Sequence, residues 1–387
     1  MGSIDRPWDL SLGKLAAALG VVATAGLVGC PSGSSGGKAD EGGPKPKPAA
    51  KAASTAASAP KAGAEAAPKS PAAAGDLVVL SGRKEALVGP LLAAFEADTK
   101  KAGGPGVKLA VDYGKTAALA MRLVAEGERS GGDVVLAQEV GYLGSLGKAG
   151  LLAPVPAEVS AQVGEAFRDP QAQWVGVSGR LRVLVRGGKR GEAADATMPK
   201  TLKELADPRF KGKLGWAPGN ASMHAHVSVL RHLWGEAETE TWLKGMMANE
   251  AKSYPKNSPQ VRAAADGAID IGWVNHYYLH KLGLTEKAAN YSFPTAADAG
   301  NVMMVSGAAV LKSARNPAAA WKLINHLLAP ATQKRIAKEL YEYPAREGVA
   351  AHPDVPPLEG VDLAKFDARH LADVGPTVAM LRKLGLQ

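Results

Sequence analysis

Two adjacent tyrosines, Tyr277 and Tyr278, have the residue type and spacing of a site that could bind a metal ion. They follow an apolar run of strand type at residues 269–274, after which the sequence changes within two positions to polar and aromatic side chains. Such a change predicts the end of a strand. Ligands bind at strand ends in open α/β sheets, because the connecting loops converge there. We therefore expect Asn275, Tyr277 and Tyr278 to line a cleft.

The chemistry expected of this pair is the binding of a hard cation. At a strand-to-helix turn the backbone rotates, so both phenol oxygens can reach one point. A phenolate is a hard anionic donor of the kind that ferric iron prefers, and the charge of the metal removes the phenol proton well below its free pKa of about 10. The alternative is structural: Tyr277 packs in a core and Tyr278 caps a surface helix.

Two histidines offer a different chemistry. His276 and His280 have the i, i+4 spacing of one helix face and could ligate zinc. However, the sequence contains no P-loop and no His-Glu-x-x-His segment. A zinc-dependent hydrolase is therefore an alternative without a supporting catalytic motif.

The elements that must position these residues follow a repeated βα pattern from residue 76 onward. Short apolar strands alternate with amphipathic helices, which implies a mainly parallel sheet with helices on both faces. About 310 residues exceed what one such core usually holds, so two lobes are expected. The predicted strands lie at residues 77–80, 107–113 and 133–136, and the predicted helices at 86–98, 116–126 and 140–148.

Two longer runs of strand type, residues 174–186 and 301–311, each contain a Ser-Gly pair near the middle. We interpret them as strands that cross between the lobes and form a hinge, with the cleft between the lobes. The predicted fold is thus a two-lobed α/β protein. Its N-terminal lobe is expected to comprise residues 76–179 and 303–345, and its C-terminal lobe residues 180–302 and 346–387.

The first 30 residues have the pattern of an export signal. Their apolar segment, 15–28, is short for a membrane span and ends in Leu-Val-Gly-Cys at Cys30. This ending resembles the lipobox of bacterial lipoproteins, in which the cysteine is lipidated. Cys30 is also the only cysteine, so an internal disulfide is not possible.

Residues 31–75 are rich in Ala, Pro, Gly, Ser and Lys and contain no large apolar side chain. Such a composition cannot bury enough surface to offset its ordering entropy, so we expect a disordered tether. The chain has a formal net charge of +9, but its basic residues are scattered. This distribution favours attraction to anions or to a membrane surface over nucleic-acid binding.

A series of short segments runs in a fixed order through residues 76–345. Together, their order and spacing resemble the periplasmic ferric-iron-binding components of ABC importers, which have the type 2 periplasmic-binding-protein fold. The segments are Ser81-Gly82-Arg83-Lys84-Glu85, residues 133–152, Ser178-Gly179-Arg180, residues 205–213, residues 217–222, residues 254–258, Asn275-His276-Tyr277-Tyr278 and Glu342-Tyr343-Pro344-Ala345.

The resemblance implies that Tyr277 and Tyr278 are ligands of ferric iron. It also implies a synergistic anion, carbonate or phosphate, which is bound by Ser222 and neighbouring backbone N–H groups together with Asn257 and Asn275.

The sequence itself also favours an anion site at this position. Asn220 and Ser222 precede a helix predicted to begin near Met223, and the start of a helix offers unpaired N–H groups and the positive end of its dipole.

The N-terminal lobe departs from the family pattern. Some members supply a His and a Glu from this lobe, whereas the matching positions here hold Arg83 or Lys84 and Gln138. Other members have a tyrosine just before Ser-Gly-Arg, where this chain has Leu80.

Tyr113 and Glu139 are expected on loops after strands and could partly replace the missing ligands of the N-terminal lobe. Gln138 is a further possible contact from this lobe. Otherwise an anion and water must complete the coordination, with Arg83 and Arg180 neutralising the anion.

We interpret the chain as a monomeric, lipid-anchored periplasmic protein that captures ferric iron with a synergistic anion. It would deliver the iron to an inner-membrane ABC permease, and it is expected to be neither an enzyme nor a nucleic-acid-binding protein. One alternative is a binding protein for a small organic or phosphorus-containing anion without metal, which Arg83 and Arg180 would suit. The zinc-dependent hydrolase is the alternative from another class.

Overall fold

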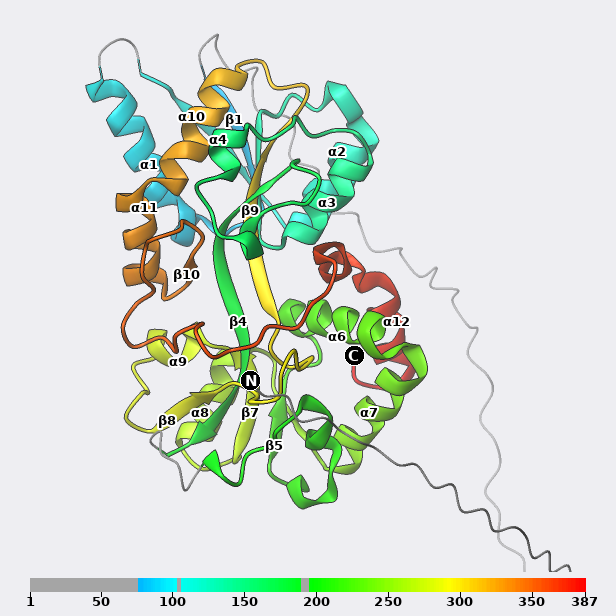
Figure 1. Cartoon of the computed structure of the whole chain (residues 1–387). Helices are drawn as coiled ribbons and strands as arrows, with labels where there is room; N and C mark the ends of the chain where they lie inside the picture. The colour runs from blue at the N-terminus through cyan, green and yellow to red at the C-terminus, as the bar shows by residue number, and fades with distance from the viewer. Residues whose placement is uncertain (1–75, 103–105, 189–194) are drawn as a thin grey trace, which may run out of the picture. The chain divides into compact units, whose positions relative to one another are not determined.

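The computed structural model describes residues 76–102, 106–188 and 195–387, all within one compact unit of the chain (Figure 1). The predicted export signal, Cys30 and the predicted tether lie outside the described residues. Within the described ranges, no helix has the length and apolar character needed to cross a membrane.

The predicted N-terminal lobe begins with the βα pattern expected from the sequence. Strand β1 pairs in parallel with β2 on one side and β3 on the other, and Leu77, Val79 and Val134 are fully buried between helices. Burial on both faces explains why these strands are continuous apolar runs. The elements are β1 (Leu77–Ser81), α1 (Glu85–Lys101), β2 (Leu109–Tyr113), α2 (Thr116–Glu126), β3 (Val134–Ala137) and α3 (Val140–Lys148).

The predicted C-terminal lobe has its own strands and a core that contains Trp216, Trp242 and Trp273. Strand β5 pairs in parallel with β6 and with β7, and β7 leads directly into the short helix α9. The elements are β5 (Leu214–Trp216), α6 (Ala221–Trp234), α7 (Glu236–Ala248), β6 (Lys252–Ser253), α8 (Asn257–Ala265), β7 (Ile271–Asn275), α9 (Tyr277–Lys281) and β8 (Ala288–Tyr291).

The long strands β4 (Val175–Gly187) and β9 (Met303–Val310) join these two regions, as the sequence predicts (Figure 1). The first half of β4 pairs with β9, and its second half pairs with β7 and β8. All of these pairings are antiparallel, so the expectation of a mainly parallel sheet is wrong and the sheet is mixed. A βα pattern indicates only how strands that follow one another in the sequence are connected. It does not predict the pairing of β4 and β9, because their neighbours in the sheet come from distant parts of the chain.

A glycine in β4 has a packing role. A Cβ atom on Gly179 would lie 2.6 Å from the sulfur of Met303 and 3.0 Å from the ring of Phe167. The Ser-Gly pair in the crossing strand therefore lets a neighbouring strand and an aromatic ring approach the backbone closely.

The segment after β9 returns to the first region and then runs to the second. It contains α10 (Pro317–Leu328), α11 (Pro330–Arg335), a π-helical turn (Ile336–Leu340), β10 (Tyr343–Pro344), the C-terminal 3-10 turn (Ala368–Ala372) and α12 (Val374–Lys383). The short elements elsewhere are α4 (Ala157–Ser160) and the 3-10 turns Gly127–Arg129, Glu165–Phe167, Leu202–Ala206 and Pro208–Phe210.

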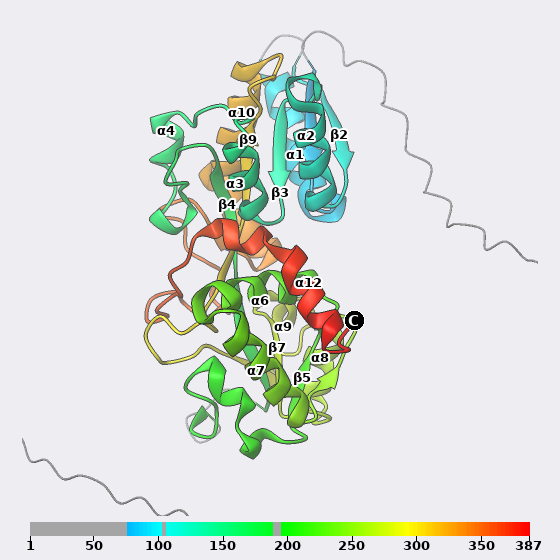
Figure 2. The ribbon, with the colours of Figure 1, turned by 90° about the vertical axis from the view of Figure 1, so that its right-hand side faces the viewer.

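The C-terminal 3-10 turn packs against both α3 and α6, and α12 packs against α6 (Figure 2). The contact with α3 is close, because a Cβ atom on Gly141 would lie 2.7 Å from the carbonyl oxygen of Ala368. Residues 346–387, which we predicted to belong to the C-terminal lobe, thus contact elements of both predicted lobes.

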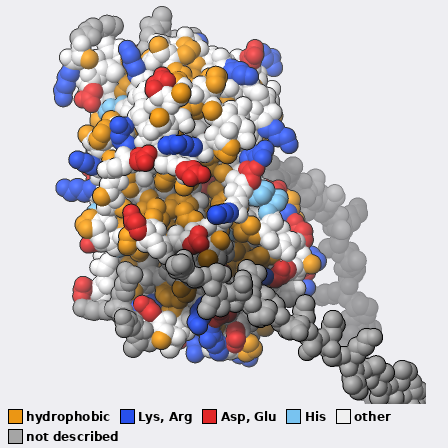
Figure 3. Space-filling view, viewed as in Figure 1, with side chains coloured by type: hydrophobic (Ala, Val, Ile, Leu, Met, Phe, Trp, Pro, Cys, Tyr) orange, Lys and Arg blue, Asp and Glu red, His pale blue; other side chains and the backbone are white. Residues whose placement is uncertain are grey.

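Charged side chains of both signs are interspersed over the face of the molecule seen in Figure 3. The space-filling view shows no broad block of Lys and Arg there, which agrees with the scattered basic residues of the sequence.

Candidate functional site

Strand β7 ends at Asn275 and helix α9 begins at Tyr277, so the two tyrosines lie at the predicted strand end. Their rings stack with centroids 4.3 Å apart and planes inclined by 29°. Both side chains therefore leave the turn on the same side. Burial and the adjacent Tyr278 raise the pKa of Tyr277, so a bound cation is needed to stabilise its ionised form.

Two buried arginines of β4, Arg180 and Arg182, provide positive charge near the tyrosines. Arg182 lies opposite Asn275 in the register of β4 and β7. Burial lowers the pKa of Arg182 to about 9, and the neighbouring Tyr278 and Tyr277 oppose this shift. Both guanidinium groups therefore favour negative charge on the phenol oxygens.

The N-terminus of α6 comes together with the end of β7. The side-chain oxygen of Asn220 caps the helix by accepting from the backbone N–H of Ser222 at 3.0 Å. The Asn275 amide nitrogen lies 3.3 Å from the Ser222 hydroxyl oxygen. Helix α6 begins at Ala221, two positions before the predicted start, because Asn220 is its cap. Of the four Asn and Ser residues predicted to bind the anion, Asn220, Ser222 and Asn275 thus lie next to one another.

The fourth, Asn257, begins helix α8 and is buried. Its side-chain nitrogen has no hydrogen-bond partner among the described residues. The same holds, within the described ranges, for Arg83 Nη1, Arg180 Nε and Glu139 Oε2. Because buried polar groups in folded proteins are nearly always paired, these unpaired atoms mark places where a ligand or solvent would complete the bonding.

Arg180 connects β4 to the loop between β3 and α3. Its guanidinium donates to the carbonyl oxygen of Gln138 and forms an ion pair of 2.9 Å with Glu139 Oε1. Burial raises the pKa of Glu139, and Arg180 offsets this only in part. Glu139 thus lies at the N-cap of α3 beside a site arginine, with one oxygen unpaired among the described residues.

Tyr113, the other proposed substitute, lies at the end of β2, at the edge of the sheet. The strand order places β4 four strands away from β2, which is roughly 19 Å at about 4.8 Å per strand. A Cβ atom on Gly89 would lie 3.7 Å from the Tyr113 hydroxyl, so this phenol faces α1. The geometry favours Glu139 over Tyr113 as a contact from this lobe.

Sequence reasoning did not single out Glu342, which is buried and pairs with Arg83. Arg83 Nη2 lies 3.0 Å from both carboxylate oxygens, and the Ser178 hydroxyl donates to the carboxylate at 2.5 Å. Burial alone would raise the pKa of Glu342, but Arg83, Arg180 and Ser178 bring it below its usual value. The sequence marks Glu342 only as part of the Glu-Tyr-Pro-Ala segment, since its partner is 259 positions away.

Both arginines expected to neutralise an anion, Arg83 and Arg180, therefore already face a carboxylate. A metal-free anion would have to compete with these two internal carboxylates. The alternative of an anion-binding protein without metal is not favoured by this arrangement.

His276 has a structural role that excludes it as a zinc ligand. Its Nδ1 accepts from the backbone N–H of Leu181 at 3.0 Å, and its Nε2 lies 2.7 Å from the carbonyl oxygen of Tyr341, to which it donates. His280 stacks on Tyr341 instead. Within the described part of the chain, no group of three or more His, Cys, Asp or Glu side chains could hold a metal. The alternative in which His276 and His280 bind zinc is therefore not favoured.

The buried His276 should make stability depend on pH. Burial lowers its pKa from 6.5 to about 4, so between these values the unfolded chain binds more protons than the folded one. The free energy of unfolding should fall by about 3 kcal/mol as the pH decreases from 7 to 4. Urea unfolding at several pH values should show this slope in the parent. The variant His276→Gln retains a donor and an acceptor but does not titrate in this range, so its stability should depend less on pH. If both proteins lost the same stability between pH 7 and pH 4, the pH dependence could not be assigned to His276.

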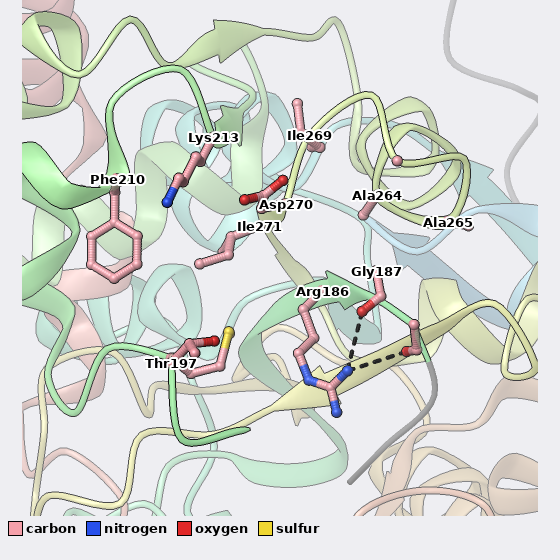
Figure 4. Close-up of a pocket in the computed structure, with 13 residues that line it drawn as sticks. Arg186, Gly187, Thr197, Phe210, Lys213, Ala264, Ala265, Ile269, Asp270 and Ile271 are labelled. Atoms are coloured by element: carbon pink, nitrogen blue, oxygen red, sulfur yellow. Dashed lines mark hydrogen bonds between the residues drawn. The ribbon is translucent and has the colours of Figure 1, made fainter. Parts of the chain in front are cut away.

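A cavity of about 420 Å³ lies at the other end of β7 from the tyrosines (Figure 4). Its lining includes Arg186, Lys213 and Asp270, and the Arg186 guanidinium donates to the carbonyl oxygens of Gly187 and Gly188. Its lining residues do not overlap with the predicted site residues.

Comparisons with known proteins identify the family and the fold. The protein family described as bacterial extracellular solute-binding protein matches residues 132–367. The Fe(3+)-binding periplasmic protein of Serratia marcescens is 31% identical over 300 residues, which cover 76% of this chain and 86% of that protein.

Solved structures show the same fold. Iron-bound HitA from Pseudomonas aeruginosa superposes with a TM-score of 0.69 at 30% identity, covering 80% of this chain and 99% of that one. The Trichodesmium protein in complex with iron and citrate gives a TM-score of 0.65 at 25% identity, covering 81% and 100%. The predicted two-lobed α/β fold is confirmed. The chain belongs to the family of bacterial extracellular solute-binding proteins.

Proposed function

We propose that this solute-binding protein captures ferric iron between its two lobes and delivers it to an ABC permease in the inner membrane. The observation that carries this function is the stacked pair Tyr277 and Tyr278 at a strand end, beside two buried arginines. Relatives named for ferric-iron binding support the same cargo. The protein acts as a carrier, without catalysis, as is usual for its family.

In this proposal, the phenolate oxygens of Tyr277 and Tyr278 coordinate the iron. Both are hard anionic donors, and together they compensate two of the three charges of ferric iron. The stacking of the rings holds the two oxygens on one side of the turn, so little side-chain entropy is lost when iron binds.

A synergistic anion, carbonate or phosphate, completes the coordination. It would accept a hydrogen bond at the start of α6 from the Ser222 hydroxyl, at the positive end of the helix dipole. The side-chain nitrogens of Asn275 and Asn257 are the further donors. The Trichodesmium structure that contains iron and citrate supports the idea that an oxygen-rich anion accompanies the metal.

The N-terminal lobe contributes through Glu139, whose Oε2 is unpaired among the described residues. Gln138 offers a neutral side chain on the same loop, and Arg180 holds this loop next to β4. We keep the lobes as residues 76–179 with 303–345 and residues 180–302 with 346–387. With these boundaries, Glu139 and the tyrosines would lie on opposite sides of a cleft, with β4 and β9 as the hinge.

An absorption spectrum tests this function most directly. Tyrosinate coordinated to ferric iron gives a visible charge-transfer band, whereas zinc or an anion alone gives a colourless complex. We expect the purified protein to become coloured when it is loaded from ferric citrate in the presence of bicarbonate or phosphate. A protein that binds iron without a visible band would contradict coordination by the tyrosine pair.

The lipid anchor is a second part of the proposal and rests on the sequence around Cys30. Acylation at Cys30 would keep a monomeric protein attached to a membrane on the periplasmic side. Cys30→Ser removes the acceptor thiol, so we expect most of the variant in the soluble periplasmic fraction and most of the parent in the membrane fraction. Immunoblots of washed fractions measure this distribution, and a variant that stays with the membrane would disprove the anchor.

A further inference from the structure

Arg182 has no carboxylate partner among the described residues, in contrast to the ion-paired Arg83 and Arg180. Its side chain is fully buried, with 0% exposure. The guanidinium donates only to neutral acceptors, at 3.0 Å to Asn275 Oδ1 and at 3.1 Å to the carbonyl oxygen of Trp273. A buried charge without a counter-charge is unfavourable, so the surroundings of Arg182 are better suited to a state in which a negative group is bound nearby.

The hydrogen bond from Arg182 determines how the Asn275 amide is oriented. A guanidinium can only donate, so the oxygen end of the amide must face Arg182. The nitrogen end then faces the Ser222 hydroxyl oxygen, 3.3 Å away at the start of α6. Because Ser222 Oγ can accept this bond, its own hydrogen is available to a ligand. Through this chain of hydrogen bonds, Arg182 causes the donor groups of Asn275 and Ser222, rather than acceptor groups, to face a ligand at the start of α6.

His226 fixes Arg182 from the other side. Its Nε2 lies 2.6 Å from the carbonyl oxygen of Ala299, which can only accept, so the proton is on Nε2 and Nδ1 is an acceptor. Arg182 Nε donates to this Nδ1 at 3.4 Å. Burial and Arg182 lower the pKa of His226, which keeps the ring neutral. The indole of Trp273 packs against both groups, 4.9 Å from the Arg182 guanidinium carbon.

We propose that Arg182, held by His226, is a positioning residue for the small oxyanion that binds together with iron. It orients the Asn275 amide so that its nitrogen faces the start of α6, and it supplies a positive charge that forms no ion pair with a carboxylate of the described residues. This inference rests on the function proposed above. The ligand class is a small oxyanion with several acceptor oxygens, such as phosphate or carbonate.

The experiment measures how much an anion strengthens iron binding. Iron is competed away with citrate at fixed pH, with and without inorganic phosphate, and in a parallel series with and without bicarbonate. We expect at least one anion to strengthen iron binding by the parent and to shift its visible band. In Arg182→Met, this anion-dependent strengthening should fall about tenfold or more, because the amide is no longer oriented and the charge is absent. A purely structural role would weaken binding equally with and without the anion.

Arg182→Lys is a second variant that tests the same inference if Arg182→Met does not fold. Lysine keeps the charge, but one ammonium group cannot hold Asn275, Trp273 and His226 at once, so the response should be intermediate. Arg186→Met removes another buried arginine of β4, at the far end from the tyrosines, and should keep the full anion response. The inference is overturned if the Arg182 variants respond to anions like the parent, or if neither anion affects a coloured parent complex. A colourless parent would instead overturn the proposed function itself.

Discussion

Tyr277→Phe and Tyr278→Phe should each lower the affinity for ferric iron by a factor of about a hundred or more, with little change in stability. Each substitution keeps the ring and its stacking but removes a charged ligand from a partly buried cation. Loss of such a partner typically costs several kcal/mol, and each 1.4 kcal/mol is about a factor of ten in affinity. Citrate competition followed at the visible band measures the loss, and thermal unfolding of the iron-free proteins measures stability.

Two control variants test whether the N-terminal lobe substitutes for missing ligands. Tyr113→Phe makes the same chemical change at a phenol that faces α1 and should leave iron affinity within about twofold of the parent. Glu139→Gln removes a carboxylate next to Arg180 and should have an effect between that of Tyr113→Phe and that of the tyrosine pair. If both variants of the pair bound iron with the parent's affinity and colour, the iron site would lie elsewhere.

Glu342→Leu should lower the free energy of unfolding by about 3–5 kcal/mol. The carboxylate is buried and accepts from Arg83 and from the Ser178 hydroxyl, so its removal leaves a buried guanidinium without a counter-charge. Urea unfolding of the iron-free protein measures the change.

A double variant and an exposed pair serve as controls for the buried pair. Arg83→Met combined with Glu342→Leu removes both charges and should recover most of the stability lost in Glu342→Leu alone. Arg122 and Asp112 form an exposed pair at 2.8 Å, and Asp112→Asn should cost less than about 1 kcal/mol. Equal losses in Glu342→Leu and in the double variant would show that the two charges are not coupled.

Local sequence patterns predict the elements that carry the tyrosines. The change from an apolar run to Asn275 and Tyr277 coincides with the end of β7 and the start of α9, because strand burial and the turn are encoded within a few residues. The Asn220 cap at the start of α6 is visible in the sequence for the same reason.

The remaining features of the site depend on contacts between distant parts of the chain. Arg83 and Glu342 are both ordinary surface residue types, and only the fold buries them against each other. Arg182 lies in a strand whose apolar character is clear, yet its pairing with Asn275 depends on the register between β4 and β7. The mixed sheet was missed for the same reason, since antiparallel pairing of β4 and β9 leaves no local pattern.

The close contact between Gly141 of α3 and the C-terminal 3-10 turn affects how the hinge can move. Strands β4 and β9 provide two connections, and the 3-10 turn, which contacts both α3 and α6, provides a third that lies away from those strands. Bending at the strands alone would pull this contact apart or compress it, and the fit at Gly141 is so close that even a Cβ atom there would lie 2.7 Å from the Ala368 carbonyl oxygen. If β4 and β9 act as a hinge, we therefore expect the contact between this turn and α3 to confine the motion to fewer directions than two strands alone would allow.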